Sequence, residues 1–227
     1  MKKIGKWFVP SDENWPDVLQ RVKAERWSCI EPIERSLQYV KRFNKAIDVG
    51  TWIGDSTKII HKNFHTTIGF EPNRDVFECC KENLKHMNNI SLHNIALSNT
   101  AGKKIFLNGP SSFSGWVNTI DRETLQNWQQ LKIIRTKGKV QCRSLDSFNF
   151  RGINFLKLDA DSHEGFIVKG SLKFFNRNNP VILIEYKPKI RKRQNLTMPD
   201  PLDLLSSIGY KVVEKIDPID YILTRDL

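Results

Sequence analysis

From Lys45 onward, short apolar segments alternate with longer segments of mixed polarity. The apolar segments have the length of strands and cover residues 46–49, 66–70, 90–97, 139–145, 153–159 and 181–186. The mixed segments are typical of helices and cover residues 54–64, 73–87, 163–177 and 201–208. Apolar strands that alternate with helices predict a parallel sheet covered on both faces.

The C-terminal end of the pattern is different. Two further strands, 210–216 and 220–226, are joined only by Asp217, Pro218 and Ile219. So short a connection predicts an antiparallel hairpin, because a parallel connection needs a long crossover. A mostly parallel sheet that ends in an antiparallel pair resembles the seven-stranded sheet of the class I methyltransferases. The predicted fold is therefore a doubly wound, Rossmann-like α/β domain.

The segment before Lys45 reads as helical. Ser11 is a candidate N-cap for a first helix that carries Pro16 in its early turns, and a second helix is predicted over about 29–43. We expect residues 1–44 to form an N-terminal helical extension packed on a main domain of residues 45–227.

Residues 109–137 interrupt the alternation of strands and helices. This insertion is rich in Ser, Trp and Asn, and long irregular loops in compact domains are often binding loops. One interpretation is that the insertion faces the substrate. The other is that it is a surface loop with a short helix at 121–131.

Composition narrows the class of protein. Of the 227 residues, 39% are hydrophobic, which is too many for a disordered chain. The longest apolar runs are far shorter than the roughly 18 residues of a membrane span, and the N-terminus lacks the apolar region of a signal peptide. The four cysteines form no C-x-x-C pair and have no histidine at zinc-ligand spacing. We expect a cytoplasmic protein with reduced thiols and no membrane span.

The net charge of +11 permits an acidic partner without requiring one. Nucleic acid, an anionic glycan and a phosphorylated small molecule are the candidates. The basic residues are dispersed except for the run KPKIRKR at 187–193, which is either a solvated loop or a loop that contacts an anion.

The strongest motif is AIDVGTWIGDST at 46–57, where a strand is followed by a glycine-containing turn and a helix. Ligands of open α/β sheets bind at this end of the strands. A dinucleotide fingerprint that starts at Gly50 requires glycine at 52 and 55, but the chain has Trp52 and Asp55, which disfavour a pyrophosphate. S-adenosylmethionine fits better, because its ammonium and sulfonium groups tolerate a nearby carboxylate such as Asp48.

The next strand ends at Glu71, 21 residues after Gly50. A carboxylate at about this spacing accepts hydrogen bonds from ribose hydroxyls; the alternative is an ordinary acid leading into a helix. Strand 90–97 is expected to pass the adenine pocket. The predicted cofactor contacts are Asp48, Gly50, Thr51, Trp52, Gly54, Asp55, Ser56, Glu71, Pro72, Asn94, Ala96 and Asp159.

Six segments together resemble the FkbM-type methyltransferases. They lie in the family's order and spacing over residues 45–187, and they read IDVGTWIGDST, IGFEPNRDVFECCKENL, NIALSNTAGKKIFL, CRSLDSF, FLKLDADSHEGFIVKGSLKFF and NPVILIEYK. The resemblance implies a class I fold, S-adenosylmethionine as the donor, and O-methylation of a sugar, polyketide or other small metabolite. The chain departs from the family where Thr51, Trp52 and Ile53 replace a Gly-Ala-Asn-like turn, and where residues 159–162 replace Asp-Val-Glu-Gly.

A hydroxyl acceptor must lose a proton, so a carboxylate or histidine is expected beside it. The candidate catalytic residues follow two neighbouring strands and are Asp159, Asp161, His163, Glu164 and Glu185. The spacing of Asp161 and Glu164 also fits a helix capping box. A metal ion held by these acids is a disfavoured alternative, and we expect none.

Three functions remain open at this stage. The favoured one is O-methylation of a small metabolite, sugar or glycan. A nucleic-acid methyltransferase is the second. Against it, the chain lacks the motifs typical of amino-methylating enzymes and of cytosine-C5 methyltransferases. Asp159 could belong to a ribose-methylating Lys-Asp-Lys-Glu set, but nothing in the sequence places two lysines beside it. A non-catalytic cofactor-binding module is the third, and the presence of both Asp48 and Glu71 argues against it.

Overall fold

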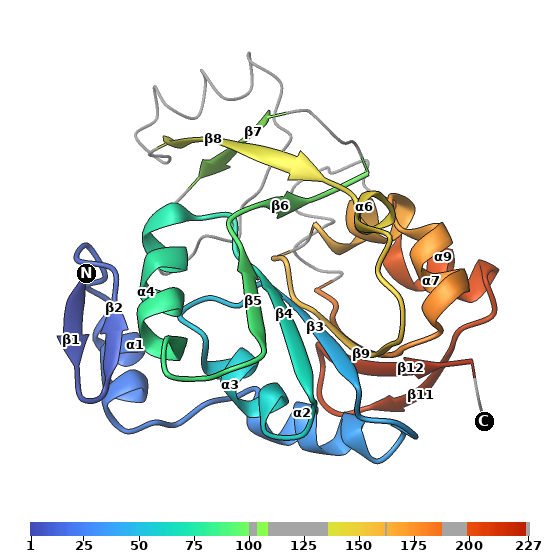
Figure 1. The fold of residues 1–227 in the computed structure, drawn as a ribbon, viewed down its shortest axis with the longest axis horizontal. Helices are drawn as coiled ribbons and strands as arrows, with labels where there is room; N and C mark the ends of the chain where they lie inside the picture. The colour runs from blue at the N-terminus through green and yellow to red at the C-terminus, as the bar shows by residue number, and fades with distance from the viewer. Residues whose placement is uncertain (100–103, 109–135, 162, 188–198, 226–227) are drawn as a thin grey trace.

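A central sheet organises the molecule. The computed structural model describes residues 1–99, 104–108, 136–161, 163–187 and 199–225 (Figure 1). Seven strands lie in the order β11-β12-β10-β9-β3-β4-β5. Their bounds are β3 Lys45–Val49, β4 Thr66–Phe70, β5 Ile90–His93, β9 Ile153–Leu158, β10 Val181–Glu185, β11 Lys211–Lys215 and β12 Asp220–Thr224. All neighbours are parallel except β12, which is antiparallel to β10 and β11. The predicted fold class is confirmed.

Helices cover both faces of this sheet. They are α1 Pro16–Lys23, α2 Ile30–Leu37, α3 Asp55–His61, α4 Arg74–Leu84, α6 Glu164–Lys169, α7 Leu172–Asn178 and α9 Pro201–Ser207, with a 3-10 helix, η2, at Leu145–Phe148. Strand β9 shows the two layers, since Leu156 packs with Ile167 of α6 while Phe155 packs with Ile33 of α2. Apolar residues on both faces are the reason that the central strands lack alternation.

The predicted strand 90–97 is two strands. After β5, the chain turns at Asn94, whose side-chain amide donates to the carbonyl oxygens of Glu71 (2.8 Å) and Pro72 (3.0 Å). The remaining part, β6 Ala96–Leu97, joins a smaller sheet with β8 Thr136–Arg143 and β7 Lys104–Asn108. Of the predicted insertion 109–137, residues 109–135 lie outside the described residues, and Thr136 already belongs to β8.

The N-terminal segment differs from its prediction. It opens with a hairpin, β1 Lys2–Ile4 and β2 Trp7–Val9, that the sequence did not reveal. Helix α1 begins at Pro16, so the assignment of Ser11 as its cap was wrong; proline at the first helical position has a preset φ angle and lacks an N–H that would be unpaired there. The hairpin lies beside α4 (Figure 1).

Two predicted helices are shorter than expected. Helix α2 ends at Leu37 rather than near residue 43. The segment 163–177 breaks into α6 and α7 at Gly170, whose backbone passes so close to Asn99 that an added Cβ would lie 2.5 Å from the Asn99 Cα. In the described part of the chain, no helix is long and apolar enough to cross a membrane.

Candidate functional site

The carboxyl ends of four central strands meet around one cavity of about 230 Å³. Gly50, Glu71, Asp159 and Glu185, which follow or end β3, β4, β9 and β10, all line it. A smaller cavity of about 40 Å³ shares Gly50, Glu71, Asp159 and Asp161 with the first. The two cavities therefore adjoin at the edge of the sheet where ligands of doubly wound folds bind.

The turn after β3 is built around Gly50. Its φ angle is +81°, and a Cβ at this position would lie 1.9 Å from the carbonyl oxygen of Asp159. Glycine is therefore required by both the backbone conformation and the close approach of the next strand. Trp52 also has a positive φ, +45°, and its backbone N–H donates to Glu71 Oε2 (3.1 Å).

The predicted residues of this turn divide into two groups. Trp52, Asp55 and Ser56 line the larger cavity beside Gly50. Thr51 and Gly54 line neither cavity; Thr51 is fully buried, and Gly54 packs against the side chain of Leu84. Their predicted cofactor contacts stay predictions.

Glu71 has the surroundings expected of a ligand-binding carboxylate. It is 2% exposed and borders both cavities. Its Oε1 accepts from the N–H of Asn73 (2.8 Å) and its Oε2 from the N–H of Trp52, while burial raises its pKa to about 8. The side chain of Asn73, not that of Glu71, caps helix α4 by accepting from Asp75 N–H.

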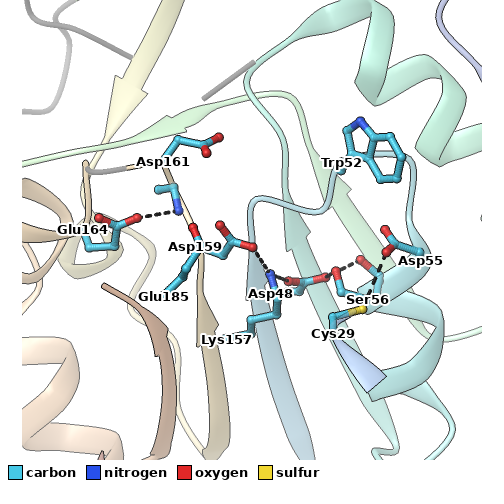
Figure 2. A network of polar contacts seen from close by, with 12 residues as sticks. Cys29, Asp48, Trp52, Asp55, Ser56, Lys157, Asp159, Asp161, Glu164 and Glu185 are labelled. Atoms are coloured by element: carbon cyan, nitrogen blue, oxygen red, sulfur yellow. Dashed lines mark hydrogen bonds and ion pairs between the residues drawn. The ribbon is translucent and has the colours of Figure 1, made fainter. Parts of the chain in front are cut away.

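A buried lysine connects the turn to the catalytic candidates (Figure 2). Lys157 Nζ lies 2.9 Å from Asp159 Oδ2 and 3.8 Å from Asp48 Oδ1. Asp48 is fully buried, lines neither cavity, and accepts from the hydroxyls of Ser56 (2.7 Å) and Thr57 (2.6 Å). Asp48 thus holds the start of α3 and Lys157 in place from beneath the site.

Neighbouring charges shift the pKa values of Lys157, Asp159 and Glu185. Burial disfavours the charge of Lys157, but the carboxylates of Asp159 and Asp48 outweigh it and raise the lysine pKa. Burial likewise acts to raise the pKa of Asp159, but Lys157 outweighs it and the pKa is lowered. Burial and the Asp159 carboxylate raise the pKa of Glu185. The two neighbouring acids therefore differ: Asp159 is ionised, and Glu185 holds its proton more tightly than a solvated glutamate does.

Three of the predicted catalytic acids are close together. Asp159, Asp161 and Glu185 each offer a carboxylate oxygen within 4.8 Å of the others. Lys187 Nζ lies 2.5 Å from Glu185 Oε2 and 3.9 Å from Asp161 Oδ1. The ammonium groups of Lys157 and Lys187 offset part of the negative charge of this cluster, and the expectation that it binds no metal ion stays a prediction.

The other two catalytic candidates lie further back. His163 is 2% exposed, its Nε2 is 3.0 Å from Ser98 Oγ, and it borders the smaller cavity. Glu164 borders neither cavity, and its Oε1 accepts from the N–H of Ala160 (2.8 Å). The residue at the N-cap of α6 is His163, so the capping box begun by Asp161 does not form.

Two of the three remaining cofactor candidates line the smaller cavity. Pro72 and Ala96 line it together with Phe70 and Ile167, which makes this cavity largely apolar. Asn94 lines neither cavity; its amide holds the loop after Glu71, as described above.

Sequence reasoning missed a large part of the wall. The residues not foreseen are Lys157 and a set from the N-terminal segment, Val18, Arg21, Arg26, Trp27, Ser28 and Cys29. Of the basic run 187–193, Lys187 lines the cavity, and residues 188–193 lie outside the described residues. Lys157 had a signal, since a lysine within the apolar strand INFLKL must be buried with a partner. The N-terminal residues had none, because only the tertiary structure brings them to the cavity.

Comparison with known proteins identifies the family. A sequence model of the methyltransferase FkbM domain matches residues 48–212. The chain belongs to this family. This match confirms the resemblance that the sequence motifs indicated. Membership of the FkbM family makes the protein a methyltransferase. A search of curated proteins finds no significant match.

Solved structures share its fold. The precorrin 8W decarboxylase of Methanobacterium thermoautotrophicum is 10% identical over 99% of both chains, with a TM-score of 0.50. The FkbM methyltransferase of Methylobacillus flagellatus KT is 14% identical, with a TM-score of 0.49, over 91% of this chain and 59% of that one. A ribosomal protein L11 methylase from Lactobacillus delbrueckii subsp. bulgaricus is 10% identical, with a TM-score of 0.48, over 86% and 77%. At such identities the likeness concerns the fold alone.

Proposed function

We propose that this protein uses S-adenosylmethionine to O-methylate a hydroxyl group of a small metabolite, sugar or glycan. One observation carries the proposal. The carboxyl groups of Asp159 and Glu185, each with its own lysine, open into the same cavity as the Gly50 turn and Glu71. Groups that can accept a hydroxyl proton therefore lie beside the predicted cofactor site.

The residues present suit this cofactor. The apolar smaller cavity offers Phe70, Pro72 and Ala96 to an adenine ring. Each oxygen of Glu71 accepts one backbone hydrogen bond, which leaves lone pairs for ribose hydroxyls. The buried Nε1 of Trp52 has no hydrogen-bond partner among the described residues and remains available to a ligand. When bound, S-adenosylmethionine supplies an electrophilic methyl group on a cationic sulfur.

The chain's own residues would remove the proton of the acceptor. Methyl transfer is mainly a matter of alignment, and a hydroxyl nucleophile also needs a base within hydrogen-bond reach. We assign this role to Glu185, whose raised pKa makes its carboxylate a better base than a solvated one. Lys157 keeps Asp159 ionised, and Lys187 favours the developing negative charge on the acceptor oxygen.

A ribose-methylating function is the second candidate, and one observation favours it. The structure brings Lys157, Asp159, Lys187 and Glu185 together, the residue types of the Lys-Asp-Lys-Glu set that the sequence alone could not assemble. The net charge of +11 is compatible with a nucleic-acid partner. Both candidates use the same proton-accepting groups and differ in the acceptor.

A methyl-transfer assay separates these candidates. Tritium-labelled S-adenosylmethionine is incubated with pools of hydroxylated metabolites and sugars, and separately with RNA. We expect label in a small-molecule pool, lost in Glu185→Gln and retained in Glu78→Gln, a control on the exposed side of α4. Label in RNA alone would overturn the leading proposal in favour of the second.

The location and the domain division stay proposals. A cytoplasmic protein is supported by its four free cysteines, three of them buried. We treat residues 1–44 as an extension of a main domain of residues 45–227, because the family match begins at residue 48.

A further inference from the structure

Part of the wall of the larger cavity comes from outside the family domain. Arg21, Arg26 and Trp27 line the cavity, whereas the match to the FkbM domain begins at residue 48. Chemistry common to a family is expected within the shared domain. A segment outside it is suited to what is particular to one member, and in a methyltransferase that is the acceptor.

The backbone holds the two arginines side by side. Arg21 belongs to the last turn of α1, which ends at Lys23. The chain reverses at Glu25, whose φ angle is +52°, and the N–H of Arg26 then donates to the carbonyl oxygen of Arg21 (3.0 Å). Two guanidinium groups are thereby carried by one turn at one cavity.

Neither guanidinium is neutralised by a carboxylate of the described residues. Glu25, the acid between them, pairs with Lys6 (3.3 Å). The other two cations at the cavity are engaged, Lys157 with Asp159 and Lys187 with Glu185. Both arginines therefore keep their donors for a ligand. Guanidinium groups bind carboxylate and phosphate oxygens in a two-point manner.

We propose that the methyl acceptor carries an anionic group, a carboxylate or a phosphate, that Arg21 and Arg26 bind. The inference rests on the proposed function and names the class of its substrate. The cavity then has two unlike regions: the arginines bind the anion, and Glu185, beside Asp159, accepts the proton of the hydroxyl. The acid-rich region repels a reversed acceptor, which gives orientation as well as affinity.

The first experiment uses inorganic phosphate as the probe. Nitrogen-15-labelled protein is titrated with phosphate at constant ionic strength, in the presence and absence of S-adenosylhomocysteine, while the arginine Nε–Hε signals are followed by NMR. The signals of Arg21 and Arg26 are identified by their loss in Arg21→Gln and Arg26→Gln. We expect saturable shifts at both and weakening of at least about tenfold in the double variant. Arg151→Gln, which alters an exposed arginine at the far end of β9, serves as the control.

Several results would overturn the proposal. One is the absence of saturable shifts at the two arginines, and another is phosphate affinity that the double variant leaves unchanged. S-adenosylhomocysteine affinity that falls tenfold or more in the double variant would assign the arginines to the carboxylate of the cofactor instead. Failure of S-adenosylhomocysteine to bind wild-type protein refutes the proposed function, while the phosphate titration without it still decides whether the anion site exists.

A second experiment tests the acceptor class directly. The labelled-methyl assay compares matched pairs, such as glucose with glucose 6-phosphate and glycerol with glycerol 3-phosphate. Activity toward anionic members, with KM raised at least about tenfold by the double substitution and kcat little changed, supports the proposal. Equal methylation of the neutral members contradicts it.

Discussion

At the scale of single residues, Lys157 is the centre of the site. It lies between a fully buried Asp48 and the catalytic candidate Asp159, and it is itself 7% exposed. A buried ion pair gives little net stability compared with an apolar replacement of the whole pair, but removing one partner leaves an uncompensated charge. Lys157 lowers the pKa of both acids; at Asp159 its effect outweighs burial, whereas at Asp48 burial still keeps the pKa raised.

Replacing Lys157 alone is expected to destabilise the fold. Lys157→Met leaves Asp48 buried without a cation, and the free energy of unfolding should fall by about 3–5 kcal/mol. Urea denaturation measures this loss. Lys45→Met, at the exposed start of β3, is the control and should change stability little. A loss for Lys157→Met no larger than that of the control would contradict the role assigned to the ion pair.

Glu185 should control the pH dependence of turnover. If its carboxylate takes the acceptor proton, kcat rises with pH until Glu185 is ionised, and its raised pKa places this rise above the range of a solvated glutamate. Glu185→Gln should lower kcat by about 10²–10⁴-fold and remove the rise, with affinity for S-adenosylhomocysteine changed less than about twofold. A variant that keeps the wild-type pH profile would exclude Glu185 as the base.

Glu71 should make stability depend on pH. Burial raises its pKa from 4.5 to about 8 on folding, so between these values the folded protein binds more protons than the unfolded one. Its contribution to stability is therefore present below pH 4.5 and is lost as the pH rises towards 8. Relative to Glu71→Gln, wild-type protein should lose stability between about pH 5 and about pH 8 in urea titrations. A constant difference would mean that Glu71 has an ordinary pKa when folded.

At the scale of elements, the side chain of Asn83 joins three segments. Its Oδ1 accepts from the N–H of Phe8 in β2, and its Nδ2 donates to the carbonyl oxygens of Phe8 and Ile53. Helix α4 thus holds the hairpin and the glycine turn in one arrangement. These bonds connect the unpredicted N-terminal hairpin to the turn after β3.

Asn83→Ala should lower both stability and cofactor affinity. We expect the free energy of unfolding to fall by about 1–3 kcal/mol, because the backbone groups lose their partners. S-adenosylhomocysteine binding should weaken as the turn at Ile53 loosens. Asn88→Ala, an exposed asparagine after α4, is the control. Unchanged binding with reduced stability would show that the turn holds without this contact.

Most of the strands and helices could be predicted from the sequence. Strand 66–70 was placed correctly, because an apolar run between helical segments leaves few alternatives. The break between β5 and β6 was missed, since it depends on Asn94 reaching the carbonyl oxygens of Glu71 and Pro72. The hairpin β1–β2 was missed because strands of three residues show no clear periodicity.

The candidate site was likewise predicted only in part. Glu71 and Asp159 were found because parallel strands bring their carboxyl ends together, whatever the rest of the fold does. Arg21 and Trp27 were not found, because no local sequence pattern connects them to the strands that form the site. Glu164 was proposed from its position after the strand; its Oε1 accepts from the N–H of Ala160, and its catalytic role stays a prediction.

At the scale of the whole molecule, the N-terminal segment and the family domain share one apolar cluster. Trp7, Val9 and Val22 pack with Ile53 and Val76. Three tryptophans pack beside this cluster. The ring of Trp27 is edge-on to those of Trp7 and Trp52, with ring centroids 4.9 Å and 6.4 Å apart. The turn after β3 is therefore packed against the segment that carries the two arginines.

This shared cluster predicts cooperative unfolding. Tryptophan fluorescence, which reports strongly on the cluster around Trp27, and far-ultraviolet circular dichroism, which reports on the sheet and helices, should give coincident urea transitions. A fluorescence transition at clearly lower urea would mean that residues 1–44 detach before the main domain unfolds.

Calorimetric titration with S-adenosylhomocysteine measures whether the two adjoining cavities bind the cofactor that we propose. We expect micromolar binding to wild-type protein, a loss of at least about tenfold in Glu71→Ala, little change in Asp159→Asn, and no binding of NAD. Absence of binding by wild-type protein, or equal loss in both variants, would contradict the proposal.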